Sequence, residues 1–292
     1  MKIPFRVILN TVLIELGLTC EPVLVQLVGL VINQHTKILA MALKPDPSGI
    51  ARLIGDTTSE LIQLFPGDLT NFPLGAWALD GNDTVNGSGG SELILGNEGE
   101  DILTGLAGND SLFGGKGRDG LSGSDGNDCL SGGLDADIIL GEAGDDILFG
   151  GRGNDVLSGG DGNSTLVGGL GTDALLCGFD NNLCVLGIDP ATTDINSSDR
   201  IVNFDPDLDR IGLASGLTVN DIVLEPVENV TLTSRIDGPQ ALLQFLPPDM
   251  RENTEPVSGT LIRVRNSNLI LGFVDDLTPN ELQSRIVSVQ GF

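Results

Sequence analysis

The chain has little of the chemistry that many enzymes and nucleic-acid-binding proteins need. It contains one histidine, and its 15 lysines and arginines face 41 aspartates and glutamates, a net charge of −26. One histidine cannot supply the paired histidines of an H-E-x-x-H zinc protease, and no G-x-S-x-G or Walker A motif occurs. The negative charge argues against a nucleic-acid partner and favours cations. We therefore predict no enzymatic activity.

Cysteine is also scarce. The four cysteines do not form the dense pattern of a disulfide framework. Cys129 falls at an outward strand position, and Cys177 and Cys184, seven residues apart, could pair. Free thiols are the expected state.

Glycine and aspartate are abundant, and they recur with a fixed period. Residues 78–176 divide into eleven nine-residue units of the pattern G-G-x-G-x-D-x-U-x, where U is a large aliphatic residue. Position eight is aliphatic in every unit: Val85, Ile94, Leu103, Leu112, Leu121, Leu130, Ile139, Leu148, Leu157, Leu166 and Leu175. A disordered glycine-rich linker does not need its aliphatic residues in phase, so the period indicates a folded repeat.

Each column of the repeat has a physical role. Position eight is the only column that is always apolar, so it should face a core, while positions seven and nine point outward from a short strand. The first six residues should form a turn, because glycine permits positive φ and close approach of the backbone. Two units then make one coil, and eleven units make five and a half coils, roughly 26 Å long at about 4.8 Å per coil.

Position six supplies a carboxylate in ten units. It is Glu92 in the second unit, Ser164 in the tenth and aspartate in the other nine: Asp83, Asp101, Asp110, Asp119, Asp128, Asp137, Asp146, Asp155 and Asp173. Carboxylate and backbone carbonyl oxygens together suit Ca²⁺, which takes six to eight oxygen ligands. The block has three Lys/Arg against eighteen Asp/Glu and would repel itself without a cation. We expect its folding to be coupled to metal binding.

This stretch resembles the hemolysin-type (RTX) calcium-binding repeats of secreted bacterial proteins, whose parallel β-roll holds Ca²⁺ between turns of successive coils. The resemblance implies two edges of turns. The odd edge holds Asp83, Asp101, Asp119, Asp137, Asp155 and Asp173, enough for five ions. The even edge matches only from Asp110 through Asp128 to Asp146, enough for about two. The resemblance also assigns metal-binding turns to the position-four glycines Gly99, Gly108, Gly117, Gly126, Gly144 and Gly153. Asp135 replaces one of these glycines, and we expect that turn to survive.

The chain divides into three parts: residues 1–77, 78–176 and 177–292. Residues 1–44 are apolar but interrupted by charge, and could form a folded cap or interaction segment, a targeting segment, or a membrane-surface contact. Thr57 to Glu60 reads as a capping box, which predicts a helix over about 58–65. We expect that helix and Trp77 to plug the open N-terminal end of the roll.

The outward positions differ between the two faces of the roll. The even units carry the more apolar set, an expected interaction face for a flanking segment, a protein partner or an oligomer: Leu93, Leu95, Phe113, Ile147, Phe149 and Val167.

Beyond the repeats the sequence predicts a β-rich capping domain. Residues 199–213 resemble the segment that follows the roll in the same family, with Asp205, Asp207 and Asp209 in a turn that could hold a last Ca²⁺ or be simply solvated. Strands are expected at 222–224, 241–245, 260–264 and 269–273, with a polar loop over 247–256. A second capping box with proline at its first helical position predicts a helix from about Pro279.

The fold class is therefore mainly β: a right-handed parallel β-roll with a small, partly helical N-terminal cap and a C-terminal β-rich cap. Three functions stay open. The first is a calcium-binding, non-catalytic structural or surface protein, secreted or at the cell surface. The second is an accessory or scaffold subunit docked to a larger, membrane-associated assembly through its apolar face and N-terminal segment. The third is a secreted enzyme or toxin fragment.

Overall fold

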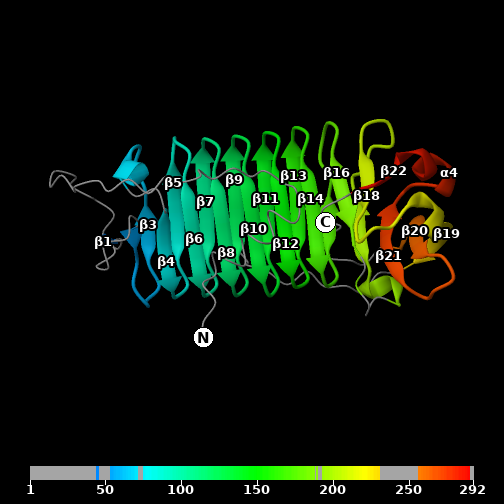
Figure 1. Cartoon of the computed structure of the whole chain (residues 1–292), viewed down its shortest axis with the longest axis horizontal. Helices are drawn as coiled ribbons and strands as arrows, with labels where there is room; N and C mark the ends of the chain where they lie inside the picture. Colours follow the sequence, from blue (N-terminus) through cyan, green and yellow to red (C-terminus); the bar gives the residue numbers. More distant parts are fainter. Residues whose placement is uncertain are drawn as a thin grey trace.

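A spiral of parallel strands forms the body of the molecule. The computed structural model describes residues 44–45, 53–71, 75–187, 189, 193–230 and 256–289. Within them the chain alternates between two 11-stranded sheets, which both extend along the long axis in Figure 1, with the C-terminal cap at one end. The predicted fold class, a parallel β-roll, is confirmed.

The first sheet takes strands that follow the even turns. Its order is β1 (Lys44–Pro45), β2 (Leu53–Ile54), β4 (Ala76–Asp80), β6 (Leu93–Glu98), β8 (Ser111–Lys116), β10 (Cys129–Leu134), β12 (Ile147–Arg152), β14 (Thr165–Leu170), β16 (Leu183–Leu186), β18 (Arg210–Leu213) and β22 (Ile286–Ser288). All neighbours are parallel except β1 and β2.

The second sheet takes strands that follow the odd turns and ends in an antiparallel meander. Its order is β3 (Leu61–Gln63), β5 (Thr84–Ser88), β7 (Ile102–Ala107), β9 (Gly120–Asp125), β11 (Ile138–Ala143), β13 (Val156–Asp161), β15 (Ala174–Leu176), β17 (Asp199–Val202), β21 (Ile270–Asp275), β20 (Val257–Val264) and β19 (Ile222–Val230). Only β19, β20 and β21 pair antiparallel.

The register is fixed at eighteen residues per coil. Leu112 pairs with Leu130, and Leu130 pairs with Leu148, so two nine-residue units complete one coil as the sequence predicts. The position-eight side chains are 0–1% exposed and belong to one continuous core. Because the core is only one aliphatic side chain wide on each sheet, other interactions must help to hold the coils together.

The strands are longer than the sequence suggests. In most units they span six residues, from position seven to position three of the next unit, so the turn is three residues rather than six. The backbone bends inside most strands at position two, where φ is positive, as at Gly115 (122°) and Leu106 (77°). This bend lets one strand continue through residues that we expected in the turn.

The coil also continues beyond residues 78–176. At the N-terminal end Leu53, Ile62 and Ala76 extend the inward column. At the C-terminal end Cys184 and Ile201 pair with Leu166 and Leu175 and do the same. Figure 1 shows β16 and β18 stacked on the repeats without a break.

The predicted helix over 58–65 is wrong. Leu61–Gln63 is strand β3, and Ile62 is completely buried beside Val85. A 3-10 turn, η1, follows only at Asp68–Asn71. The alternation of Leu61, Ile62 and Gln63 fits a half-buried strand, and packing on the neighbouring coil outweighs the local capping signal.

Trp77 is not a plug. It lies in β4 between the buried Ala76 and Ala78, and its own side chain is half-buried. Since successive side chains in a strand point to opposite faces, Trp77 points outward beside Leu95, its neighbour on β6.

The C-terminal cap follows the predictions where it is described. Strands β19, β20 and β21 cover three of the four expected strands, and helix α4 begins at Pro279 and ends at Leu282. The backbone N–H of Thr278 donates to Glu281 Oε2 at 2.9 Å, as a capping box requires. Short 3-10 turns complete the cap: η2 (Ile195–Ser197), η3 (Val219–Asp221) and η4 (Gln283–Arg285). The expected strand over 241–245, most of the 247–256 loop and residues 1–43 lie outside the described residues.

Two cross-links tie the end of the roll together. Cys177, directly after β15, and Cys184 of β16 are both fully buried and form a disulfide, so the expectation of free thiols is wrong. Arg200 of β17 forms a buried ion pair with Asp275 of β21, which joins the last odd strand to the cap.

Both outer faces carry apolar side chains that are removed from solvent. On the even face Leu95 and Phe113 are 6% and 5% exposed, and the other four residues of the expected interaction face are half-buried. The odd face, predicted from the sequence to be the more polar, carries a buried apolar cluster: Ile138, Leu140, Val156, Ala174, Leu176 and Val202. No described helix is long and apolar enough to cross a membrane.

Candidate metal centres along the two turn edges

A ladder of hydrogen bonds runs along each edge through the position-six side chains. The backbone N–H of Asp101 donates to Asp119 Oδ1, one coil later, at 2.8 Å, and the N–H of Asp119 donates to Asp137 Oδ1 at 2.8 Å. Each carboxylate therefore uses one oxygen to satisfy a buried amide of the preceding coil. We call these position-six residues the ladder residues.

The odd ladder is longer than the repeat block. It runs through Glu60, Asp83, Asp101, Asp119, Asp137, Asp155, Asp173 and Asp199. The even ladder runs through Glu92, Asp110, Asp128, Asp146, Ser164, Asn182 and Asp209.

The second carboxylate oxygen of nine ladder residues has no hydrogen-bond partner although it is buried. These are the Oδ2 atoms of Asp83, Asp101, Asp110, Asp119, Asp128, Asp137, Asp146, Asp155 and Asp173. Buried polar atoms are nearly always paired, and an unpaired charge is far more costly. Nine orphaned oxygens in one register indicate that these turns are built to hold cations.

The position-one glycines make the space for these oxygens. A Cβ atom on Gly96 would lie 2.2 Å from Asp101 Oδ2 and 2.8 Å from the carbonyl oxygen of Gly114, one coil later. The same clash, at 2.1–2.4 Å from Oδ2, arises in eight units. Any side chain at position one would fill the cradle between carboxylate and carbonyl.

The position-four glycines bring the turns of successive coils together. Gly117 has φ of 119°, and a Cβ there would lie 1.8 Å from the carbonyl oxygen of Gly99. Gly108, Gly126, Gly144 and Gly153 have the same left-handed conformation. Asp135 takes this conformation without being glycine, with φ of 74°, so the expectation that its turn survives is confirmed.

Burial makes the ladder carboxylates hard to ionise without a cation. Desolvation, with repulsion from neighbouring carboxylates, raises the pKa of Asp101 to about 6, of Asp119 to about 8 and of Asp137 to about 9. On the even edge burial raises the pKa of Asp110 and Asp146 to about 7. A bound cation would reverse this effect because it stabilises the charged form.

The even edge shows what happens without a ladder aspartate. The N–H of Asp146 donates to Ser164 Oγ at 3.1 Å, and the N–H of Ser164 donates to Asn182 Oδ1 at 2.8 Å. The Glu92 carboxylate instead accepts from the N–H and hydroxyl of Ser88. A hydroxyl or an amide therefore maintains the ladder, but neither leaves a free charged oxygen.

Three ladder residues were missed by the nine-residue register: Glu60, Asp199 and Asp209. Asp199 is almost fully buried, and desolvation raises its pKa to about 7. A signal was present, because Asp199 and Asp209 each begin a D-R-I sequence that repeats the D-x-U core of the motif. Glu60 Oε2 lies in the usual cradle, 2.5 Å from a Cβ placed on Gly55.

Two of the three aspartates that follow β17, Asp205 and Asp209, accept hydrogen bonds from the backbone of their own turn. Asp209 Oδ2 accepts from the N–H of Asp205 at 2.8 Å, and Asp205 Oδ1 accepts from the N–H of Asp207 at 2.7 Å. This pattern is that of a self-capped turn, and Arg285 lies 3.7 Å from Asp207.

The donor set of each cradle fits calcium. Among the described residues, no three Asp, Glu, His or Cys side chains converge as a metal cluster; each cradle instead combines carboxylate with backbone carbonyl oxygens. Such hard oxygen ligands suit Ca²⁺, whereas zinc prefers nitrogen and sulfur. Ca²⁺ would supply the positive charge that the orphaned Oδ2 atoms lack.

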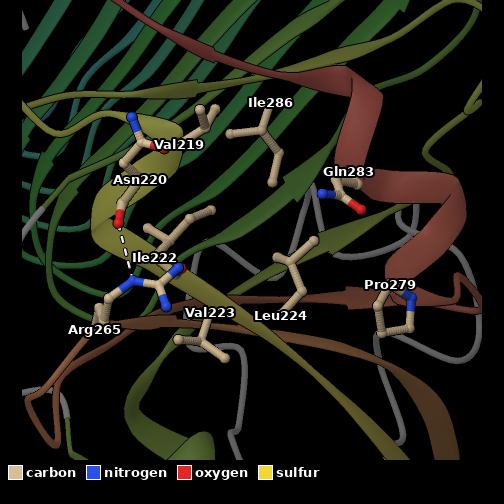
Figure 2. A pocket seen from close by; sticks show the side chains of 9 residues that line it. All are labelled: Val219, Asn220, Ile222, Val223, Leu224, Arg265, Pro279, Gln283 and Ile286. Carbon is tan, nitrogen blue, oxygen red and sulfur yellow. Dashed lines mark hydrogen bonds between the residues drawn. The ribbon is translucent and has the colours of Figure 1, made fainter.

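A separate pocket of about 540 Å³ lies in the C-terminal cap (Figure 2). Its lining includes Ile222, Leu224 and Ile286, and its one charged residue, Arg265, donates to the carbonyl oxygens of Asn220 and Ile222. The lining offers no carboxylate, histidine or cysteine, so the site chemistry of the described residues lies along the two edges.

Comparison with known families agrees with this geometry. The model of the RTX calcium-binding nonapeptide repeat matches segments that together cover residues 76–183. A comparison with curated proteins found no matching relative. The matched block contains all nine orphaned carboxylates, and it ends within β16, where the coil still continues. The central block of this chain is a calcium-binding β-roll of the RTX nonapeptide-repeat family.

Proposed function

We propose that this is a non-catalytic, calcium-dependent structural or surface protein whose roll becomes ordered when calcium binds. The observation that carries the proposal is that the two carboxylate oxygens of each position-six aspartate have different roles. One oxygen of each aspartate holds the preceding coil, as Ser164 and Asn182 also do, while the second is buried with no partner. That second oxygen needs a cation.

We propose five to seven bound ions, five on the odd edge and about two on the even edge. Six orphaned Oδ2 atoms lie on the odd edge and three on the even edge. An ion between two coils needs a ladder carboxylate and the carbonyl oxygens of a neighbouring turn. Calcium should therefore bind first where two consecutive ladder residues on one edge are both aspartates.

The location that fits this function is outside the cell. The disulfide between Cys177 and Cys184 is typical of oxidising compartments. Sites built from carbonyls and single carboxylates fall in the weak range of extracellular modules, about 10⁻⁴ to 10⁻³ M. The roll would be loose where free calcium is low and ordered after release.

The test is size-exclusion chromatography with far-ultraviolet circular dichroism on the full chain, in excess chelator and in millimolar calcium. We expect a smaller hydrodynamic radius and a gain of β signal with calcium, and no such change with magnesium at the same ionic strength. Identical profiles in chelator and calcium would contradict the proposal.

A second candidate is an accessory subunit that docks through its even face. Ile147 and Phe149 of β12 lie beside Thr165 and Val167 of β14, and all four are half-buried, so an apolar strip is still accessible there. Such a subunit should self-associate even when calcium-loaded, and Phe149→Ser should restore the monomer. A calcium-loaded protein that is monomeric at high concentration would contradict this candidate.

A further inference from the structure

Strand β8 is buried on both of its faces. Its inward Leu112 belongs to the core, and its outward Ser111 and Phe113 are only 9% and 5% exposed. In β12 and β14 of the same sheet the inward side chains are buried, but the outward ones are only half-buried. Since these strands share one register, the sheet by itself does not explain the extra burial at β8.

The extra burial extends over three neighbouring strands of the even sheet, β6, β8 and β10 (Figure 1). Leu95 of β6 pairs with Phe113, Cys129 of β10 pairs with Ser111, and these outward side chains are 6% and 5% exposed in Leu95 and Cys129. We call these four residues the covered patch.

The described neighbours of β8 do not lie over the covered patch. The strand pairs with β6 and β10 at its sides and packs across the core on β7 and β9. Neighbours in the same sheet shield the flanks of an outward side chain but not its tip. A further segment must therefore lie on the outer face at this place.

The covered patch contains a disulfide-bonded cysteine. Cys129 is in a disulfide, and none of the described cysteines is free. Cys177 and Cys184 are bonded to each other. The chain has four cysteines, so the remaining partner within it is Cys20, in the N-terminal segment.

The N-terminal segment, residues 1–43, enters the roll on the same sheet as the covered patch. It leads into β1, and the sheet continues through β2, β4, β6 and β8 to β10, five steps of about 4.8 Å or about 24 Å in all. Cys20 lies 24 residues before Lys44. That length spans about 36 Å as a helix and more when extended, so Cys20 can reach Cys129.

The composition of this segment suits an apolar surface. Residues 1–43 carry three Lys/Arg against two Asp/Glu, whereas the whole chain has a net charge of −26. Apolar runs such as 7–9 and 12–14 can bury Leu95 and Phe113 without placing a charge on them, and burial of apolar surface favours the contact.

We propose that the N-terminal segment covers the even face over β6, β8 and β10 and is fastened there by a disulfide between Cys20 and Cys129. To form this bond, the two thiols give up two protons and two electrons to a small-molecule disulfide, which becomes two thiols. The apolar strip on β12 and β14 stays open. The inference goes beyond the proposed function and does not depend on calcium uptake.

The first test is peptide mapping of the full chain produced in an oxidising compartment, alkylated and then digested without reduction. Trypsin releases Cys20 in peptide 7–37 and Cys129 in peptide 119–152. Mass spectrometry should find these two peptides joined, and reduction should separate them. Alkylated Cys20 and Cys129 would overturn the inference. So would peptide 119–152 joined to a second copy of itself, which would make the patch an interface between two chains.

The second test asks whether the fastened segment covers the patch. Phe113 and Phe149 stand at the same position of the even face, but Phe113 is 5% exposed and Phe149 is half-buried. Hydroxyl-radical footprinting of the calcium-loaded full chain should therefore oxidise Phe113 more slowly. In Cys20→Ser the oxidation of Phe113 should rise severalfold, because the segment loses the advantage of an intramolecular tether. Phe149 is the internal control and should not change.

Two footprinting results would overturn the inference. An unchanged rate at Phe113 in Cys20→Ser would mean that the disulfide does not hold the cover. An equal rise at Phe113 and Phe149 would mean that the variant loosens the roll as a whole, and circular dichroism in saturating calcium would show the same loss of structure.

Discussion

The odd and even edges of the roll share one backbone and differ in a single column of side chains. Both have the same turns, the same parallel register and an unbroken hydrogen-bond ladder. The odd edge keeps aspartate from Asp83 to Asp199, whereas the even edge changes to Ser164 and Asn182. Since the ladder tolerates this change, hydrogen bonding alone does not explain the aspartates. The comparison indicates that the hydrogen bond from each aspartate stacks the coils, whereas its negative charge serves to bind calcium.

The largest effect should come from filling a cradle on the odd edge. In Gly132→Ala the new Cβ would lie 2.1 Å from Asp137 Oδ2, so the carboxylate must move and the site is lost. We expect the calcium-loaded protein to lose about 3 kcal/mol of unfolding free energy, as for an overpacked site, measured by chemical denaturation. Gly89→Ala is the control, because a Cβ there meets nothing within 4 Å. Equal stability of the two variants would contradict the prediction that a position-one glycine is needed to leave space for the calcium-binding carboxylate.

The second prediction concerns pH. Burial raises the pKa of Asp101, Asp119 and Asp155 to about 6, 8 and 7 in the calcium-free fold, above the ordinary value of 3.8. The calcium-free fold therefore binds more protons than the unfolded chain. Its stability should be greatest below about pH 4 and fall as pH rises through 6 to 8.

Calcium should reverse that trend, because it binds the deprotonated carboxylates and releases protons. Calcium affinity should therefore rise from pH 6 to pH 8. Thermal unfolding in chelator and in calcium across this range checks both slopes. A calcium-free protein that becomes more stable as pH rises would contradict the assignment of the orphaned oxygens.

The third prediction separates the two roles of one aspartate. Asp137→Asn keeps an acceptor for the N–H of Asp119 and removes the charge. In chelator the variant should be more stable than the unaltered protein, because no carboxylate at position 137 has to be buried or protonated on folding. In calcium it should be less stable, because it lacks the charged ligand. A change in the same direction under both conditions would argue for a purely structural role.

Asp145→Asn is the control for this prediction. Asp145 is exposed at position five and accepts from the N–H of Asn163, and Asn127 makes the equivalent contact one coil earlier. Neither condition should distinguish this variant from the unaltered protein.

The smallest predicted effect is a gain on the even edge. Gly159 retains the cradle, with the carbonyl oxygen of Cys177 2.7 Å from a Cβ placed there, but Ser164 supplies no carboxylate. Ser164→Asp should add one calcium ion and about 1 kcal/mol of stability in calcium. Ser164→Asn should preserve the ladder and add no ion, which elemental analysis of the dialysed protein would detect.

Much of this comparison follows from the nine-residue period. The period places Leu112, Leu130 and Leu148 in one core column and places their aspartates at successive turns, because parallel strands in register repeat their neighbours. The fold class and the nine aspartates with an orphaned oxygen were therefore predictable from the sequence.

The remaining ladder residues were not predictable because insertions break the period. The ladder step is 18 residues inside the repeats but 23 from Glu60 to Asp83, 26 from Asp173 to Asp199 and 27 from Asn182 to Asp209. A period cannot say where the chain rejoins a sheet after a longer loop. Pairing with the neighbouring strand decides it, as the unpredicted strand β3 also shows.

Local signals also failed where packing had the larger effect. Thr57 to Glu60 has the letters of a helix cap, yet Glu60 is a ladder residue and Ile62 fills the core. The odd face looks polar as a whole, but Ile138 pairs with Val156 in a buried apolar cluster that also contains Leu140 and Leu176. The prediction compared the outward side chains of all odd units together, so a local apolar cluster within that face was not apparent.

The most direct test of the account is calorimetric titration of the chelator-treated full chain with calcium at pH 7.5, followed by circular dichroism. The account predicts uptake of several ions per chain, proton release in buffers of different ionisation enthalpy, and a gain of β signal that saturates with the binding heat. No heat of binding, together with identical spectra in chelator and calcium, would contradict it.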